Sequence, residues 1–222
     1  MRKNIKNLNT RVYPPNGRVR VAVPLRVNDE AVRLFAISKL DWIKQQQTRF
    51  VRQERQLTGE FVSGEIHYFQ GSRYLLDVIY QDGSSSVSLH NQTRMDLIVP
   101  PSSDMAQREQ ILLSWYRQQL KEMIPPLIAR WEAIIGVQVA EWGVKQMKTR
   151  WGSCNIRARR IWLNLALINK PVYLLEYVIV HELVHLLERQ HNDKFKAYMS
   201  KYLPDWRLYR EELNIVPPGY GV

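Results

Sequence analysis

The 222-residue chain has few cysteines and no long apolar segment, and each of these features excludes a class of protein. It contains one cysteine, Cys154, so it can form no internal disulfide, which suits a reducing cytoplasm. No apolar run approaches the ~18 residues that a membrane-spanning helix needs, and the basic first residues lead into no apolar signal core. The composition therefore predicts a globular, cytoplasmic protein without membrane insertion.

Acidic residues are outnumbered: 32 Lys and Arg stand against 21 Asp and Glu, which leaves a net charge of +11. Such an excess indicates an anionic partner, such as DNA, another polyanion, an acidic peptide or membrane headgroups. Between Glu141 and Glu176 there is no acidic residue, while seven basic residues and Trp142, Trp151 and Trp162 fall there. This segment is either a solvated sheet surface with tryptophans in the core or a nucleic-acid contact, where aromatic rings can stack on bases.

The most specific chemistry lies in His181-Glu-Leu-Val-His185, an HExxH motif. A helix turns ~100° and rises ~1.5 Å per residue, so the two histidines would share one face about a turn apart. Both can then bind one metal ion, and Glu182 can reach a water molecule on it as general base. This is the arrangement of a zinc-dependent peptidase. The alternative is a core helix in which the same three side chains are satisfied by ordinary partners.

Catalytic zinc is usually held by three protein ligands, and His191 is the candidate for the third. In a continued helix His191 would lie ~9 Å further along the axis than His185, which zinc–nitrogen bonds of about 2 Å forbid. The chain must therefore leave the helix between about residues 188 and 190. Asn192 or Asp193 can cap a new helix that runs to residue 203.

Other third ligands remain open at this point. A carboxylate of Asp193, Glu211 or Glu212, or a water molecule, could take the place of His191. The spacing from His181 to His191 equals that of the metzincins, but Glu188 stands where their pattern has a glycine. The chain is therefore not expected to be a metzincin.

Several stretches together resemble a known family. Residues 148–154 read KTRWGSC, residues 160–167 read RIWLNLAL, and the HExxH segment and residues 191–195, HNDKF, follow. This combination resembles the YgjP-like metallopeptidases, bacterial relatives of the SprT-like (Spartan) and WLM proteases, over nearly the whole chain. The resemblance implies that His181, His185 and His191 bind one zinc ion and that Glu182 is the base.

The order of predicted elements indicates an α+β fold. An alternating strand at 18–27 and a long helix from 28 to about 56 precede an expected β-meander at 61–99. Then come a helical region at 103–135 interrupted near Pro125-Pro126, strands near 137–141, 144–147 and 161–165, the HExxH helix, and one or two short helices to 213. We interpret residues 1–101 as a β-rich module with one long helix, and residues 102–222 as a minimal zincin-like catalytic module.

The leading hypothesis is peptide hydrolysis by a zinc-activated water, with the strand at 161–165 accepting the substrate as an added strand. Arg150, Tyr198 or Tyr202 could stabilise the oxyanion, and Glu176 or Asn164 could orient a ligand histidine. The alternative is a basic nucleic-acid-binding module with a structural metal site. Both combine in a peptidase acting on nucleic-acid-associated proteins, since SprT-like relatives are associated with cutting proteins attached to DNA. A metal-binding chaperone that has lost catalysis is a third interpretation.

Overall fold

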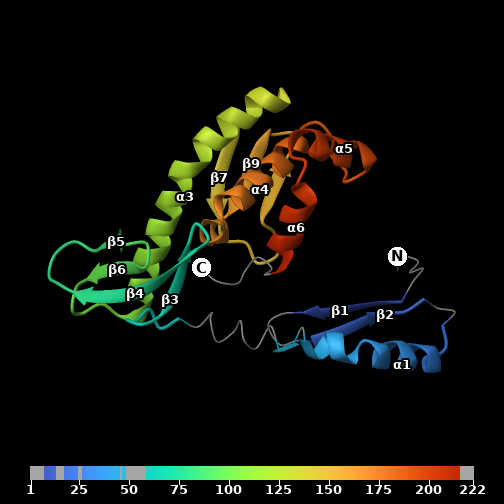
Figure 1. The fold of residues 1–222 in the computed structure, drawn as a ribbon, viewed down its shortest axis with the longest axis horizontal. Helices are drawn as coiled ribbons and strands as arrows, with labels where there is room; N and C mark the ends of the chain where they lie inside the picture. The colour runs from blue at the N-terminus through green and yellow to red at the C-terminus, as the bar shows by residue number, and fades with distance from the viewer. Residues whose placement is uncertain (1–7, 14–17, 25–26, 46, 49–58, 216–222) are drawn as a thin grey trace. The chain divides into compact units, whose positions relative to one another are not determined.

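The computed structural model describes residues 8–13, 18–24, 27–45, 47–48 and 59–215. The chain divides into two compact units, Met1–Thr58 and Gly59–Val222. Figure 1 shows the helices and strands of each unit. No helix in the described part of the chain is both long and apolar enough to cross a membrane.

The first unit contains a hairpin and a helix. Strand β1 (Asn9–Tyr13) pairs antiparallel with β2 (Arg18–Ala22), which is shorter than the predicted strand at 18–27. Helix α1 (Asp29–Ser38) begins as predicted after Asn28, whose side chain accepts a hydrogen bond from the Ala31 N–H at 2.9 Å. The helix is interrupted at Lys39 and resumes over 40–45, and the predicted part beyond residue 48 lies outside the described residues.

The second unit begins with a four-stranded mixed sheet rather than the predicted meander. Its strands β3 (Ile66–Phe69), β4 (Ser72–Tyr80), β5 (Ser86–His90) and β6 (Arg94–Val99) lie in the order β3-β4-β6-β5. The meander is wrong because β6 inserts between β4 and β5 and runs parallel to β4. It is the most buried strand of this sheet, and its Met95, Leu97 and Val99 are fully buried.

The long helix α3 (Met105–Ile135) follows this sheet in the chain and packs against it (Figure 1). It begins with a capping box between Asp104 and Gln107 and ends at Gly136, whose φ of 76° suits glycine. The predicted interruption is wrong, since Pro125 and Pro126 lie inside one continuous helix. Both prolines are exposed, and the carbonyl groups that their missing N–H groups leave free belong to the exposed residues 121 and 122, where water can satisfy them.

A second sheet lies next to α3 and carries one face of the site. Its strands β7 (Glu141–Lys145), β8 (Gly152–Asn155) and β9 (Arg160–Asn164) have the order β7-β9-β8, with β8 antiparallel to β9. The two strands predicted at 137–141 and 144–147 are replaced by the single strand β7. Gly143, the residue at which we expected a break, lies within β7. Its lack of a side chain leaves room for the Trp162 ring on the neighbouring strand, since a Cβ there would lie 2.2 Å from that ring. Strand β8 was not predicted.

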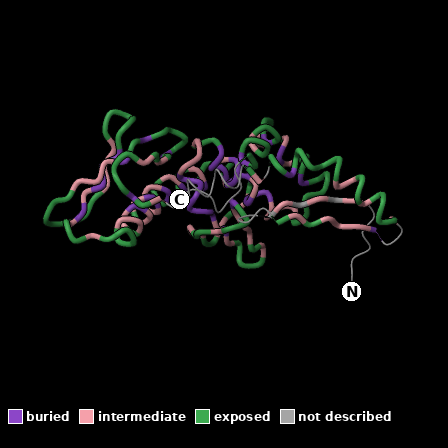
Figure 2. Tube along the Cα trace, turned by 90° about the horizontal axis from the view of Figure 1, so that it is seen from below, coloured by how far each residue is buried: buried purple, intermediate pink, exposed green. Residues whose placement is uncertain are grey.

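The remaining elements are helical: η1 (Leu165–Asn169), α4 (Val172–Val184), α5 (Asp193–Tyr202) and α6 (Trp206–Ile215). Helix α4 is the HExxH helix, and most of its residues are buried in the core. Figure 2 shows the buried residues gathered within the second unit. Among the residues of the first unit whose burial is described, by contrast, Pro24 and Ile43 alone are buried. The α+β class with a zincin-like histidine site is confirmed.

The division between units does not coincide with the predicted module boundary near residue 101. Strands β3–β6 pack on α3 and η1. For example, the Gln70 N–H, next to β3, donates a hydrogen bond to the carbonyl group of Ile168 in η1 at 2.7 Å. They therefore belong to the same compact unit as α4. Whether residues 1–101 and 102–222 can fold as separate modules stays a prediction.

Candidate active site

The end of α4 brings the third histidine back to the first two. The helix ends at Val184 with His185 as its C-cap, and the chain then turns towards His191. Asn192 caps α5, since its side chain accepts a hydrogen bond from the Phe195 N–H at 3.0 Å. The predicted exit from the helix before His191 is thus confirmed, although the helix ends a few residues earlier than expected.

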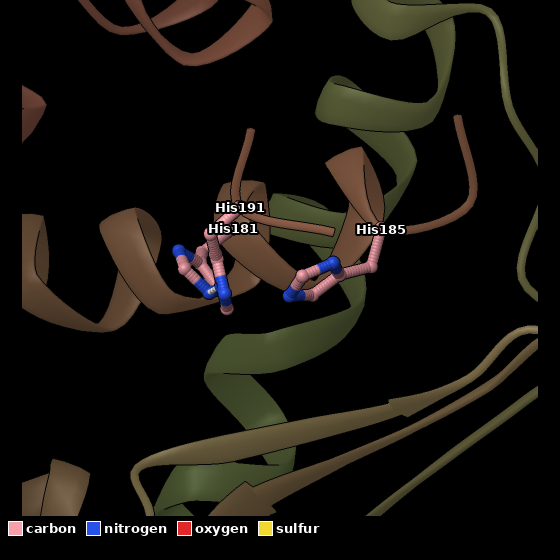
Figure 3. Close-up of side chains that lie close together, drawn as sticks. All are labelled: His181, His185 and His191. Carbon is pink, nitrogen blue, oxygen red and sulfur yellow. Dashed lines mark hydrogen bonds between the residues drawn. The ribbon is translucent and has the colours of Figure 1, made fainter. Parts of the chain in front are cut away.

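The three histidines form a compact cluster (Figure 3). One ligand atom from each of His181, His185 and His191 lies within 4.8 Å of the others. The Nε2 atoms of His181 and His191 are 2.9 Å apart. Neighbouring nitrogens around tetrahedral zinc are ~3.3 Å apart when the bonds are ~2.05 Å long, so the cluster is close to the size that a metal ion requires.

The rival ligands named above lie outside this cluster, which is the one such group in the described part of the chain. Asp193 forms an ion pair with Lys196 at 2.8 Å. Glu212 accepts a hydrogen bond from the Tyr173 hydroxyl at 2.6 Å.

The protonation of the histidines also suits a metal. The Nδ1 atom of His185 is 3.2 Å from the Glu188 carbonyl, which can only accept, so this nitrogen carries the hydrogen and leaves Nε2 free to bind. Burial lowers the pKa of His181 to about 3, and it also lowers the pKa of His185 and His191. All three are therefore neutral near pH 7, the state that binds metal. The Nδ1 atom of His181 is buried and has no partner among the described residues.

Glu182 is buried beside the cluster, with 5% of its surface exposed. Burial raises its pKa to about 8, while the positive charge of Arg150 acts in the opposite direction. A cation held by the adjacent histidines would lower this pKa further. The carboxyl group is therefore placed to exchange a proton near neutral pH.

These groups lie in a cleft of about 1410 Å³. One wall is formed by β8 and its neighbours, residues 149–157, and the other by parts of α4, α5 and α6. Within the described residues β8 pairs with β9 alone, so its second edge is free. The predicted substrate edge at 161–165 is wrong, because β9 is the central strand of its sheet.

Some predicted supporting roles are also wrong. The Asn164 amide donates to the carbonyl groups of Met147 and Arg150, and Glu176 accepts from the Trp131 indole at 2.7 Å, so neither orients a histidine. Tyr198 and Tyr202 stack on each other away from the cleft lining. Of the three proposed oxyanion donors, Arg150 alone lines the cleft.

Sequence reasoning missed three residues of this site. Arg210 on α6 lies near His181 and His191, and its charge lowers the pKa of both. Tyr177 packs its ring 5.9 Å from that of His181, a contact that the spacing of four on one helix could have indicated. Gly152 adjoins Glu182; its position in the KTRWGSC stretch was a signal, whereas nothing in the sequence marked Arg210.

A buried glutamate next to three converging histidines, two of them on an HExxH helix, defines the centre of a metal-dependent hydrolase. Residues 6–215 match the YgjP-like family described as "YgjP-like, metallopeptidase domain". The chain therefore belongs to the YgjP-like metallopeptidases, which makes it a hydrolase acting on peptides and implies a bound metal ion.

Two solved structures of archaeal metallopeptidase zymogens are similar to part of the chain. Abylysin of Pyrococcus abyssi is 20% identical with a TM-score of 0.38, and the match covers 40% of this chain and 90% of abylysin. Jannalysin of Methanocaldococcus jannaschii is 23% identical with a TM-score of 0.36, and the match covers 40% of this chain and 90% of jannalysin. No curated protein matches the chain in sequence.

Proposed function

We propose that the protein is a zinc-dependent peptidase in which the Nε2 atoms of His181, His185 and His191 hold the ion and Glu182 is the general base. The observation that carries this proposal is the convergence of three neutral histidine nitrogens within 4.8 Å, beside a buried glutamate. Imidazole ligands also suit other divalent metals, and three histidines with a water molecule in the fourth position would be a common ligand set of catalytic zinc.

When bound, the ion polarises the scissile carbonyl and lowers the pKa of a water molecule towards neutrality. Glu182 takes the proton of the attacking water and then passes it to the leaving amine. Arg150 and Arg210 line the cleft near Glu182 and near the histidines, where a positive charge stabilises the developing oxyanion.

The free edge of β8 is the natural place for the substrate backbone. An extended peptide can pair with it as an added strand, which holds the scissile bond over Glu182. The proposed binding edge is therefore β8 in place of β9.

Metal content and activity test the proposal together. Elemental mass spectrometry of the purified protein should find close to one zinc per chain, and His191→Ala should lose most of it. Glu182→Gln keeps the shape of the side chain and removes the base, so it should retain zinc and lose activity by ~10²–10⁴-fold. Zinc binding that survives His191→Ala contradicts the ligand set, and full activity of Glu182→Gln contradicts the mechanism.

A second proposal concerns nucleic acid as a tether for the substrate. The outer face of the sheet β7-β9-β8 carries Trp162, which is half-buried and has the Lys145 ammonium 3.6 Å from its ring centre, with Arg160 close by. This face and the net charge of +11 favour a polyanion. Added DNA should then accelerate the cleavage of DNA-bound proteins, with an affinity that falls steeply with salt. Rates unchanged by single- or double-stranded DNA would count against the tether.

A further inference from the structure

We infer that the active-site cleft selects acidic polypeptides, with acidic side chains on both sides of the scissile bond. This inference rests on the proposed peptidase function and names its substrate class. The observation behind it is the charge of the cleft walls.

The charges that line the cleft are almost all positive. Four arginines and a lysine contribute to its lining, and the sole acidic residue among the described lining residues is Glu182, which is buried. The five cations are Arg150, Arg157, Arg189, Lys196 and Arg210.

None of the four arginines forms an ion pair with a carboxylate of the described residues, and all four are exposed; the nearest such influence is that of Arg150 on the buried Glu182. Elsewhere in the described part of the same unit, Arg94 is paired with Asp96, Arg130 with Glu176 and Arg160 with Glu141. Other exposed arginines there, such as Arg73, also lack an ion pair, so the cleft is distinguished by the gathering of four such groups around one space. Of the lining cations, Lys196 is the one neutralised by a neighbour, Asp193. The cleft therefore presents unneutralised guanidinium groups to whatever enters it.

Their positions place positive charge on both sides of the reacting bond. Arg150 and Arg157 flank the two ends of β8, the proposed binding edge. Arg189 follows the end of α4, and Arg210 lies on α6 across the cleft, near His191. A peptide lying along β8 would therefore meet guanidinium groups before and after its scissile bond.

The chemistry of the lining favours carboxylates over nucleotides. Guanidinium groups bind carboxylates in a bidentate manner and keep their charge at every relevant pH. Binding of single-stranded nucleic acid relies in addition on exposed aromatic faces. The aromatic residues of the lining, Trp151, Tyr177, Phe195 and Trp206, are all at most 9% exposed, so they present little face for a base to stack on.

The test uses the zinc-loaded protein of 222 residues and three peptides that share one scissile sequence. Three positions on each side of the scissile bond are all Glu, all Gln or all Lys. Cleavage should follow the order Glu, Gln, Lys, with kcat/KM differing by about tenfold or more between the extremes and with the difference residing mainly in KM. Since the charges are exposed, the preference should shrink as salt is raised.

Charge-reversal variants locate the preference. Arg157→Glu and Arg189→Glu should each lower kcat/KM for the Glu peptide and raise it for the Lys peptide. Arg73→Glu is the matched control: it changes the net charge equally on an exposed residue of β4, outside the cleft lining, and should leave the order intact. Equal rates for the three peptides, or a preference that survives both cleft variants, would overturn the inference and leave the peptidase proposal standing.

If no peptide is cut, a binding measurement still tests the acidic selectivity separately from the peptidase proposal. Fluorescence anisotropy with the labelled Glu and Lys peptides should still report tighter binding of the Glu peptide, lost in Arg157→Glu. That result supports acidic selectivity even where the peptidase proposal fails. Tighter binding of an oligo-dT probe than of the Glu peptide, with the same dependence on Arg157 and Arg189, would overturn the choice of polypeptide in favour of nucleic acid.

Discussion

Gly152 is the point at which the backbone of β8 comes closest to Glu182. A Cβ at this position would lie 2.6 Å from Glu182 Oε1, and 2.9 Å from both Glu182 Cγ and Val178 Cγ1. Glu182 and Val178 are both buried, so neither can move away freely. The absence of a side chain at Gly152 therefore fixes where the carboxyl group of Glu182 can lie.

We expect Gly152→Ala to displace the Glu182 carboxyl group and to lower kcat by about tenfold or more, because small misplacements of a reacting group cost large factors in rate. Zinc content should stay unchanged, since the histidines are not touched. Steady-state kinetics and elemental analysis check this, with Ser153→Ala on the same strand as the control. An unaltered kcat in Gly152→Ala would contradict the positioning role.

The histidine cluster should make the metal-free protein sensitive to acid. Burial lowers the folded-state pKa of His181, His185 and His191 below the ordinary value of 6.5. Below pH ~6.5 the unfolded chain therefore binds more protons at these positions than the folded chain, so stability is present above that pH and falls as the solution is acidified. Urea unfolding at pH 7.5 and 5.5 measures the effect.

A variant with all three histidines changed to Gln should show a smaller loss between the two pH values, since the other histidines remain in both proteins. Equal losses in the two proteins would contradict the assignment. Saturating zinc should strengthen the fold at pH 7.5 and less at 5.5, because protons compete for the ligand nitrogens.

At the level of elements, the site depends on how α4 ends and α5 begins. His185 and His191 come together because the chain leaves α4 at Val184 and starts α5 under the cap of Asn192. Asn28 caps α1 in the same way, with its side chain bonded to the N–H three residues on. The two caps form a natural pair of variants.

Asn192→Ala should destabilise the fold by about 1 kcal/mol, the usual cost of losing a helix cap. It should also weaken zinc binding severalfold, because His191 is the adjacent residue and loses part of its support. Asn28→Ala should leave the zinc affinity unchanged. Competition with a zinc chelator measures both, and equal zinc affinities in the two variants would contradict the link between the cap and the site.

For the whole molecule, the sheet β3-β4-β6-β5 belongs to the catalytic unit. Its central residues Met95 and Leu97 are fully buried, and Met95 Sδ lies 3.9 Å from the hydroxyl of Tyr116 on α3. The Arg108 guanidinium donates hydrogen bonds to the carbonyl groups of Glu60 and Phe61. Without residues 59–101, α3 would lose these partners and expose its buried stripe.

We therefore expect residues 59–222 to unfold as one cooperative unit that keeps the three-histidine cluster and its ability to bind metal. Residues 102–222 alone should fail to fold, because the apolar area buried by the sheet on α3 would face water. Denaturant unfolding and zinc content of the two fragments decide this. A stable, zinc-binding fragment 102–222 would instead support the modular boundary near residue 101.

The sequence alone determined what depends on near neighbours in the chain. The shared face of His181 and His185 follows from helix geometry, and a helix cap at Asn192 or Asp193 from side-chain chemistry over three residues, of which the structure has Asn192. The need for the chain to leave the helix before His191 follows from the length of a metal–nitrogen bond. Each of these was predicted, and the structure has each local feature.

The tertiary structure decided what depends on residues far apart. The parallel pairing of β4 and β6, the free edge of β8, the approach of Gly152 to Glu182 and the place of Arg210 beside His191 all join distant segments. Which strands pair, and which side chains come close, depends on how apolar surfaces from distant parts of the chain pack together. A pattern of neighbouring residues does not contain this information. The sequence thus determined the chemistry of the centre, and the packing of the chain determined the walls around it.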